Sequence, residues 1–404
     1  MKTIKYFIIV LATGLLAWMM PMMYHIITDE ASGNIFTYYS SLEKSFCTID
    51  FDEVNERLIR KNMKTGKEYN EAEFDSILPL FYYRQLLSDG RMPDTIHGVA
   101  VTTKDINSKT FYFRVNPTDK NTPHIPLYTL FESMSGRVNL EMPGDLFRIT
   151  NKIEFVDPEN NQVKTGKSAL FMRAFEKRNF HFPAKLVAGN PSTRKPYEEG
   201  YFITDSEDQM FHLKMVNGKP FLRKVTIPEG VKPVHIAVME PSDRSFYAFF
   251  FDEEHKMYQI QTDAYKVVAI PTPEFDLNRD KMMIMANPLY WNINVMSKKG
   301  KKAFAMDVHT REIVDQVTID HDTKEAGFFS DLFPVSLYFE SPYTRFVKPM
   351  MYFGGVTVLF FNLFFVLLFV GIMRYRKQPL SFIPLVWVAL TGVLGFIPCL
   401  VLSK

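Results

Sequence analysis

The residues that most resemble a chemical site are short polar clusters, and none of them completes a known motif. Gly166-Lys167-Ser168 matches the end of a phosphate-binding loop, but Asn161 stands where that loop needs its first glycine. Asp205-Ser206-Glu207-Asp208 offers carboxylates without the ligand spacing of a calcium loop. The nine histidines form no His-Glu-x-x-His pair, and there is no Gly-x-Ser-x-Gly sequence. We therefore interpret these clusters as hairpin turns and predict no catalytic, cofactor-binding or metal-binding residue.

Composition narrows the possible partners. Lys and Arg number 47 against 45 for Asp and Glu, so the concentrated positive charge that nucleic acid requires is absent. The two cysteines, Cys47 and Cys399, indicate no disulfide scaffold and form no Cys-x-x-Cys metal site. Hydrophobic residues make up 47% of the chain, a high share that indicates membrane segments in addition to a soluble core.

A short strand between two prolines recurs along the middle of the chain. Pro233–Pro241 is the clearest copy, Pro183–Pro191 precedes it and Pro334–Pro342 follows it. Further copies are Leu78–Phe81, Ile125–Tyr128 and Lys281–Pro288. The six copies lie 47 to 57 residues apart, a period typical of repeat architectures whose units bury their apolar faces against each other.

The segments between these copies have the pattern of β-hairpins. Ile203–Leu213 and Phe250–Ile260 align at a constant shift of 47 residues, with acidic turns between apolar runs, and Val295–Met306 follows. A further strand is predicted after each hairpin, at Phe221–Ile227, Tyr265–Ile270 and Arg311–Ile319. Four antiparallel strands in each of six units predict a mainly β fold, a six-bladed β-propeller over residues 34–346.

In a closed ring the strand Val335–Phe339 should pair with residues near Phe36–Phe51, because closure removes free edges. The first two units are ambiguous, since Phe74–Leu87 and Leu127–Met134 also have apolar residues at helical spacing. The alternative fold is therefore an α/β N-terminal portion followed by a smaller β domain of three or four units.

Three apolar runs are long enough to cross a membrane. Tyr6–Ile27 predicts an N-terminal anchor within residues 1–28; the alternative is a cleaved signal peptide with Ala31-Ser32-Gly33 as its cleavage site. Met350–Met373 and Pro379–Leu402 carry no charge and predict a transmembrane helical hairpin within residues 350–402.

Basic residues at the ends of these runs predict the topology. Lys2 and Lys5 precede the first run, while Arg374, Arg376 and Lys377 join the other two. Because Lys and Arg concentrate on the cytoplasmic side, both positions should be cytoplasmic. The large domain is then exported, and a third crossing would place Ser403-Lys404 outside as well.

The segment Glu73–Asp94, with Phe-Asp-Ser-Ile-Leu-Pro-Leu-Phe-Tyr-Tyr-Arg and Ser-Asp-Gly-Arg-Met-Pro-Asp, resembles an uncharacterised family of membrane proteins from Bacteroidetes-type bacteria. The resemblance covers most of the chain and brings no activity or site residue with it. It implies a multi-pass protein of a bacterial inner membrane, with the large domain in the periplasm, and an association with transporter genes.

Two functions from different classes fit these features. The first is a membrane-anchored accessory, scaffold or ligand-sensing protein that associates with another integral membrane protein, such as an ABC-type transporter. Asn362 offers a polar contact between helices, and the small residues Ala389, Gly392 and Gly395 allow close helix approach. The second is an exported hydrolase or lyase with its site in the mouth of the propeller. The sequence does not identify a soluble ligand.

Overall fold

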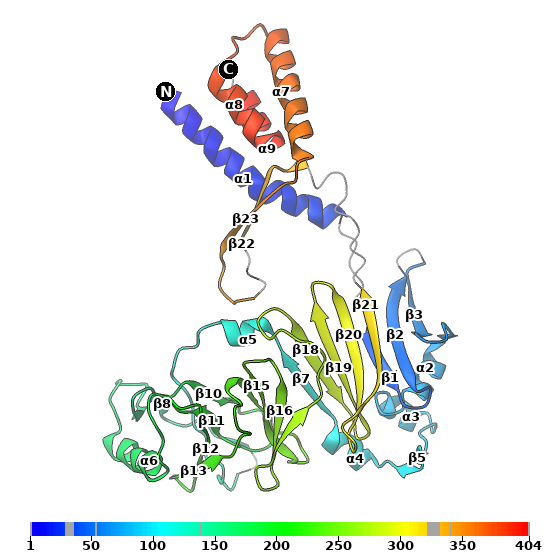
Figure 1. Ribbon diagram of the computed structural model, residues 1–404, viewed down its shortest axis with the longest axis vertical. Helices are drawn as coiled ribbons and strands as arrows, with labels where there is room; N and C mark the ends of the chain where they lie inside the picture. Colours follow the sequence, from blue (N-terminus) through cyan, green and yellow to red (C-terminus); the bar gives the residue numbers. More distant parts are fainter. Residues whose placement is uncertain are drawn as a thin grey trace. The chain divides into compact units, whose positions relative to one another are not determined.

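The computed structural model describes residues 2–28, 36–52, 55–137, 139–320, 332–339, 341 and 343–402. The chain divides into two compact units (Figure 1). The first, here the helix unit, comprises Met1–Asn34 and His321–Lys404, and the second, here the sheet unit, comprises Ile35–Asp320. The predicted cleavage site at Ala31-Ser32-Gly33 and the terminal Ser403-Lys404 lie outside the described residues.

The sheet unit contains four antiparallel sheets of four or five strands. Sheet I comprises β1 (Phe36–Ser40), β2 (Ser45–Asp52), β3 (Arg57–Asn62) and β4 (Glu68–Tyr69). Sheet II comprises β10 (Leu186–Gly189), β11 (Tyr201–Thr204), β12 (Met210–Val216) and β13 (Lys219–Val225). Sheet III comprises β14 (Pro233–Val238), β15 (Phe246–Asp252), β16 (Met257–Gln261) and β17 (Val267–Ile270). Sheet IV comprises β18 (Lys281–Ala286), β19 (Tyr290–Ser297), β20 (Gly300–Asp307), β21 (Ile313–Asp320) and β7 (Phe111–Val115), which pairs with β18.

Short helices and strand pairs connect the sheets. They are α2 (Glu71–Ile77), α3 (Tyr83–Ser88), β5 (Thr95–Ile96), β6 (Val99–Ala100), α4 (Thr103–Lys109), α5 (Pro117–Asn121), β8 (Leu146–Ile149), β9 (Ile153–Val156) and α6 (Thr165–Lys177). A capping box starts α2, since Asn70 Oδ1 accepts from the Glu73 N–H and the Glu73 carboxylate accepts from the Asn70 N–H.

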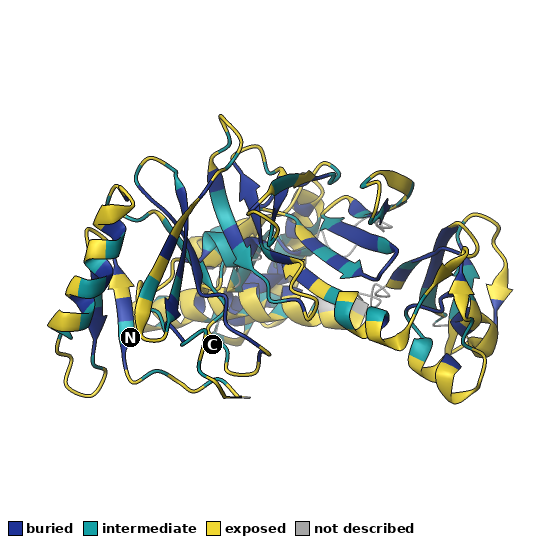
Figure 2. Ribbon diagram, turned by 90° about the horizontal axis from the view of Figure 1, so that it is seen from below, coloured by how far each residue is buried: buried dark blue, intermediate teal, exposed yellow. Residues whose placement is uncertain are grey.

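The four sheets stack face to face in one row, and helices cover both ends of it (Figure 1). Strand alternation explains the layers: in β15, Phe249 and Phe251 pack toward sheet IV, whereas Ala248 and Phe250 pack toward sheet II. Sheet IV meets sheet I through Tyr39 among others. The row runs from α6 with β8 and β9, through sheets II, III, IV and I, to α2 and α3. Figure 2 shows the buried residues along the strands of these layers.

The strongest sequence repeat is confirmed as structure. β11 with β12 and β15 with β16 form the predicted hairpins, and β19 with β20 forms the third. Asp205 and Asp252 hold equivalent turns, because Oδ1 of each accepts two backbone N–H groups of its own turn at 2.9 Å. The predicted following strands correspond to β13, β17 and β21.

The prediction of a closed six-bladed ring is wrong. The described residues hold four large sheets rather than six, and these sheets do not close. The strand Val335–Phe339 (β22) pairs with β23 (Pro349–Phe353) in the helix unit, not with residues near Phe36–Phe51. Pro183 and Pro233 lead the first strands of sheets II and III, but Pro334 leads this separate hairpin. Helices pack on the outward faces of the two end sheets, so the apolar residues there are buried without contact between the two ends.

The first two predicted repeat units are not blades. Phe74–Leu87 forms α2 and α3, as the helical alternative predicted, and Leu80 in the connection between them packs against Ile96. Leu127–Met134 is neither a helix nor a regular strand; Tyr128 makes an isolated bridge with Phe147. An apolar run interrupted by proline therefore did not distinguish a strand from a helix or a loop.

The helix unit consists of α1 (Lys2–Thr28), the β22–β23 hairpin, α7 (Val358–Tyr375), α8 (Phe382–Thr391) and α9 (Val393–Leu402). Two of its helices, over Thr3–Tyr24 and Val358–Tyr375, are long and apolar enough to cross a membrane. The expected run Met350–Met373 starts instead as strand β23. The expected second spanning helix, Pro379–Leu402, is two ten-residue helices separated at Gly392.

Candidate functional site

The residues predicted as a membrane-partner interface meet at one point inside the helix unit. Asn362 of α7 is 6% exposed, and its Nδ2 donates to the carbonyl oxygen of Ala389 at 2.9 Å. Gly392 is also buried, and a Cβ added to it would lie 2.2 Å from Asn362 Oδ1. Gly395 packs against the side chains of Trp387 and Thr391. The small residues thus permit close approach between helices of this chain, and of the four only Ala389 is exposed.

Asn362 has an unused acceptor at this junction. Its Oδ1 is buried and has no hydrogen-bond partner among the described residues. Gly392 adopts φ +54° and ψ −132°, a conformation that side-chain-bearing residues rarely adopt. The junction therefore depends on glycine at this position both for the backbone conformation and for the room beside the amide.

The basic residues predicted to set the topology lie at one end of α7 and near the start of α1. Arg374, Arg376 and Lys377 are exposed at the C-terminal end of α7, and Lys5 is half-buried. The side chain of Lys2 lies outside the described residues.

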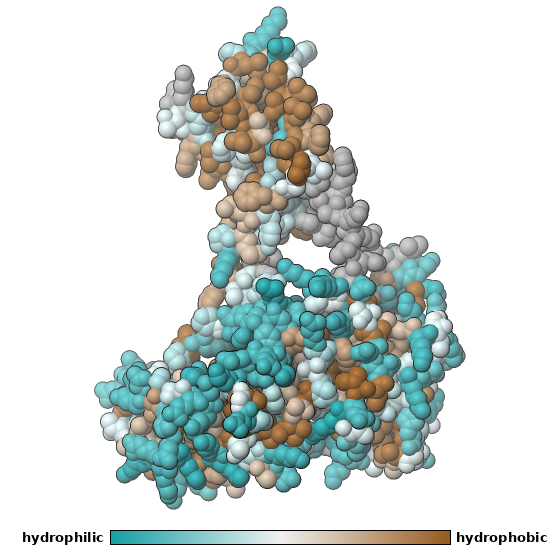
Figure 3. Space-filling view, viewed as in Figure 1, coloured by the Kyte–Doolittle hydropathy of each residue, from teal (hydrophilic) through white to brown (hydrophobic). Residues whose placement is uncertain are grey.

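The face of the helix unit drawn in Figure 3 is largely apolar (brown). On α7, Phe360 is 74% exposed and Leu367 is 63% exposed. Only 22% of the residues in the most apolar window of each long helix are buried. A helix that is hydrophobic all round and still exposed is suited to lipid or to another apolar helix rather than to water.

The sheet unit contains a buried ionic cluster that the sequence did not reveal. Lys195 Nζ lies 2.6 Å from Glu198 Oε2 and 2.7 Å from Glu240 Oε1, and all three side chains are at most 5% exposed. Asn190 Nδ2 donates to the other oxygen of Glu240 at 2.7 Å. The cluster joins the β10–β11 connection of sheet II to the end of β14 in sheet III. Burial raises the pKa of Glu198, and Lys195 opposes that rise.

A buried histidine continues this polar junction. His212 of β12 stacks on Phe202 with ring centroids 4.2 Å apart. Its Nε2 lies against the carbonyl oxygen of Glu199, and its Nδ1 lies 2.8 Å from the Tyr265 hydroxyl. A neutral ring satisfies both contacts, with Nε2–H donating and Nδ1 accepting. Burial lowers the pKa of His212 to about 3, so the ring is neutral at physiological pH.

This cluster has the residue types of an acid-base site but lacks access. Lys195, Glu198 and His212 are all buried, and they do not line the pocket at Tyr39 and Tyr290 or the one at Lys67 and Arg91. The nearest sequence signal was the run Lys195-Pro-Tyr-Glu-Glu199, in which one basic and two acidic residues flank a proline and a tyrosine. Its partner Glu240 stands 45 residues away, and no local motif links them.

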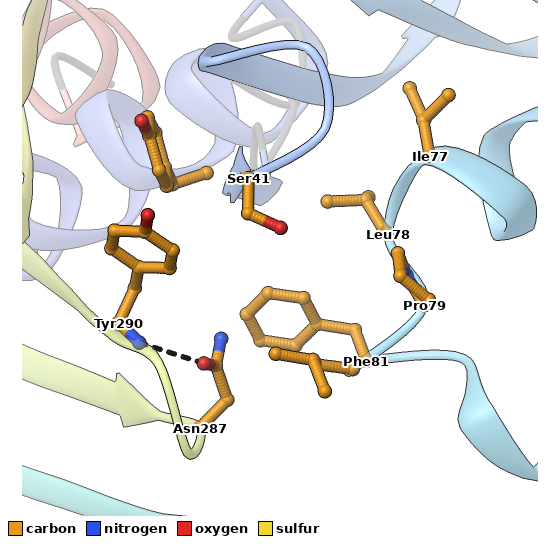
Figure 4. A pocket seen from close by; sticks show the side chains of 9 residues that line it. Ser41, Ile77, Leu78, Pro79, Phe81, Asn287 and Tyr290 are labelled. Carbon is orange, nitrogen blue, oxygen red and sulfur yellow. Dashed lines mark hydrogen bonds between the residues drawn. The ribbon is translucent and has the colours of Figure 1, made fainter. Parts of the chain in front are cut away.

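A small pocket between sheets I and IV is shown in Figure 4. Tyr39, Tyr290, Asn287 and the Ile77–Phe81 segment line it. The Asn287 side chain accepts from the Tyr290 N–H at 2.8 Å. The enclosed space of about 10 Å³ is enough for at most one water molecule, so it cannot hold a substrate.

The other polar clusters are structural. Gly166-Lys167-Ser168 begins α6, so its interpretation as a hairpin turn is wrong. Ser168 Oγ accepts the Phe155 N–H at 2.9 Å, which joins this helix start to β9. Lys167 Nζ pairs at 2.8 Å with Asp145, directly before β8. The run Asp205–Asp208 forms the predicted turn, and no group of three or more potential metal ligands occurs among the described residues.

Comparison with solved structures finds β-propellers. AztD from Citrobacter koseri, in its apo form, is 13% identical with a TM-score of 0.28, covering 70% of each chain. The Cps50 (Swd1) propeller of Myceliophteria thermophila is 13% identical with a TM-score of 0.26; the match covers 49% of this chain and 57% of that propeller, just over half its length. The SCAP WD40 domain of fission yeast is 9% identical with a TM-score of 0.24, covering 77% of this chain and 59% of that one. At these scores the matches carry no argument about function.

Sequence comparison identifies the family. No curated protein sequence matches the chain. Residues 36–306, which include all of sheets II and III, match the profile of a family described as a domain of unknown function. The expectation of a family without an assigned activity is therefore confirmed: the chain belongs to the DUF4857 family.

Proposed function

We propose that this protein is a membrane-anchored accessory or scaffold protein of a bacterial inner membrane. In this proposal α1 and α7 cross the bilayer, the sheet unit is periplasmic, and the helix unit docks against another integral membrane protein such as an ABC-type transporter. Lys5 and the cluster Arg374, Arg376 and Lys377 face the cytoplasm, in accordance with the positive-inside rule.

The exposed apolar surface of the two long helices is the observation that carries the proposal. Each helix of 18 or more residues reaches about 27 Å or more at 1.5 Å per residue, close to the thickness of a bilayer core. Phe360, Leu363 and Leu367 lie along the exposed side of α7 and would meet water if the helix unit were soluble. Lipid or a partner helix removes that cost.

The alternative of an exported hydrolase or lyase receives less support. The carboxylates and histidine that could perform acid-base chemistry, Glu198, Glu240 and His212, are buried and already paired within the chain. A catalytic group needs room for a reacting atom beside it, and the described pockets do not include these residues. The paired cluster is better suited to joining two sheets.

Two measurements test the proposal. Membranes from cells that express the full chain are washed at high pH, and the protein should remain in the pellet because α1 and α7 are embedded. The protein is then purified in mild detergent after gentle crosslinking, and at least one polytopic membrane protein should copurify. Release by the wash would overturn the anchoring, and a lone monomer after crosslinking would overturn the scaffold role.

Matched variants locate the docking surface. Phe360→Ala with Leu367→Ala trims the exposed side of α7 while keeping the helix apolar, so copurification should fall. Phe7→Ala with Leu11→Ala makes a comparable change on the exposed side of α1 and should leave copurification unchanged. Equal loss in both pairs would mean that the proposed surface on α7 is not the specific one. Asn362→Leu is unsuitable for this test, because Asn362 contacts its own chain.

A further inference from the structure

The path of α8 is antiparallel to α7. Six residues connect the C-terminal end of α7 to Phe382, where α8 begins. At its other end, Ala389 contacts Asn362, which lies in the second turn of α7. α8 therefore runs from the basic end of α7 back toward the start of that helix.

The path of α9 then returns in the opposite direction. After Gly392, the ring of Phe396 lies 5.4 Å from that of Phe365 and 6.4 Å from that of Phe369, further along α7. Cys399 shares a buried cluster with Met373, close to the basic end of α7. Figure 1 shows the first turn of α1 and the last turn of α9 at the same end of the helix unit.

Helix α1 gives an independent check of this direction. Ala17 packs in a cluster with Val393 and Leu394 at the start of α9. Ile9 packs in the cluster of Cys399 toward its end, and Tyr6 packs against the same cluster. The contacts move toward the N-terminus of α1 as α9 proceeds.

We infer that α8 and α9 form a re-entrant pair that enters the bilayer from the cytoplasmic side, turns at Gly392 and returns to the same side. Each helix has ten residues and spans about 15 Å, too short to cross a bilayer core of roughly 30 Å on its own. The end of α9 therefore lies on the side of Lys5 and Lys377 and is available to a cytoplasmic partner. The inference rests on the proposed membrane anchoring and replaces the third crossing predicted from hydropathy.

The turn has the chemistry that a reversal within a membrane requires. Backbone groups released at a helix break must be satisfied by protein, because the bilayer core offers no water. Asn362 supplies a donor to the Ala389 carbonyl, and the Gly392 N–H donates to the Val388 carbonyl at 2.7 Å. Gly395 lets α9 approach Trp387 and Thr391 of α8. The four residues first noted as small or polar are thus the components of this turn.

Single introduced cysteines test the topology in the full chain, in a background of Cys47→Ala and Cys399→Ala. Ser242→Cys, Gln378→Cys and Ser403→Cys are each treated with an impermeant maleimide in intact spheroplasts and again after lysis. Ser242→Cys should react in intact spheroplasts, whereas Gln378→Cys and Ser403→Cys should react only after lysis.

The outcomes separate the two proposals. Reaction of Ser403→Cys from outside, with Gln378→Cys still protected, would overturn the re-entrant pair and leave the anchoring intact. Reaction of Ser242→Cys and Gln378→Cys on the same side would overturn the anchoring itself. Where the cysteine-free protein fails to fold, fluorescent-protein and alkaline-phosphatase fusions at the C-terminus of the native chain give the same reading: fluorescence without phosphatase activity is expected, and the reverse overturns the inference.

A glycine substitution distinguishes a reversal from a continuous helix. In a continuous spanning helix, Gly392→Ala would raise the melting temperature, because alanine favours helix. In the observed turn the new Cβ meets Asn362 at positive φ, so the melting temperature in detergent should fall. Gly371→Ala on the exposed side of α7, where a Cβ would meet nothing within 4 Å, is the matched control and should not lower it. A rise for Gly392→Ala would contradict the turn.

Discussion

Two polar junctions between sheets differ in how completely their groups are paired. Between sheets II and III, Lys195 lies within ion-pair distance of two carboxylates, and His212 has a partner at each nitrogen. Among the described residues, Glu198 Oε2 has the ion pair with Lys195 and no further hydrogen bond. Between sheets IV and I, Asn294 is fully buried, and neither its Oδ1 nor its Nδ2 has a partner among the described residues. The Thr48 hydroxyl, on the facing side of sheet I, is likewise buried and unpaired in that part of the chain.

The difference reflects how the two junctions form along the chain. Sheets II and III are consecutive, and the segment from Asn190 to Gly200 fills the space between them with groups that match. The strands of sheets IV and I that face each other are far apart in the sequence, and few groups cross between them: Asn292 Oδ1 accepts from the Tyr39 N–H at 2.5 Å, and Lys301 Nζ donates to Thr37 at 2.7 Å. We expect the second junction to contribute less to stability per buried polar group.

Lys195→Met should produce the largest effect, because it leaves Glu198 and Glu240 buried without their cation. We expect the free energy of unfolding to fall by about 3–5 kcal/mol. Urea unfolding of the full chain in detergent measures it through Trp291, the one tryptophan of the sheet unit, in a Trp18→Phe, Trp387→Phe background. Lys185→Met, which removes a half-exposed pair with Asp208, is the control and should cost about 0–1 kcal/mol. Equal costs would show that the cluster adds nothing beyond a surface pair.

His212 should make stability depend on pH. Its pKa falls from an ordinary value of 6.5 to about 3 in the folded protein, so below pH 6.5 the unfolded chain takes up a proton that the folded chain does not. Stability should therefore be lost as pH falls from about 6.5 toward 3, at up to about 1.4 kcal/mol per pH unit from this group. His212→Gln should flatten that part of the profile measured by the same Trp291 signal. An unchanged slope in the variant would contradict the assignment.

Asn292→Leu and Asn294→Leu, both in β19, should have different effects on the free energy of unfolding. Asn292→Leu leaves the Tyr39 N–H without an acceptor and should cost about 1–3 kcal/mol. Asn294→Leu removes an amide that has no partner among the described residues, so the free energy of unfolding should stay within about 1 kcal/mol or rise. A large loss for Asn294→Leu would show that a bound water or ligand satisfies that amide.

The variants Thr48→Val and Thr37→Val test the same contrast between unpaired and paired groups at two hydroxyls of sheet I. The Thr48 hydroxyl is unpaired among the described residues, so its replacement should change the free energy of unfolding by less than about 0.5 kcal/mol. Thr37→Val removes one acceptor of Lys301 and should cost about 1–2 kcal/mol. If the two variants lose the same amount, the junction does not distinguish paired from unpaired groups.

The sequence predicted the parts of the fold whose pattern is local. The hairpins around Asp205 and Asp252 were predicted because acidic turn residues stand between two apolar runs at a fixed shift. The proposed copy at Leu78–Phe81 was wrong, since that segment joins two helices. Strand β22 was assigned to the propeller because Pro334 and Pro342 bracket it as prolines bracket Pro233–Pro241, but it pairs with β23 in the helix unit.

The candidate site was predictable only in part. Asn362 stood out as the single amide in an apolar run, but its partner Ala389 could not be known without the path of α8. The hydropathy of Pro379–Leu402 is high enough over enough residues for one crossing. Hydropathy carries no information about backbone dihedral angles, so it could not predict that Gly392 has a positive φ and ends α8. The Lys195–Glu240 pair was missed because it depends on two sheets packing together, and no spacing along the chain encodes that contact.

The helices at both ends of the row of sheets have a consequence for how such a protein can change in evolution. A closed ring constrains the number of its blades, because adding or removing one blade changes the angle at which all the others must pack to close the circle. A row that ends on α6 at one side and on α2 and α3 at the other has no circumference to satisfy. One four-stranded module could be gained or lost between the caps by duplication or deletion of about 47 residues, the shift between the two matching hairpins, and the remaining interfaces would keep their geometry.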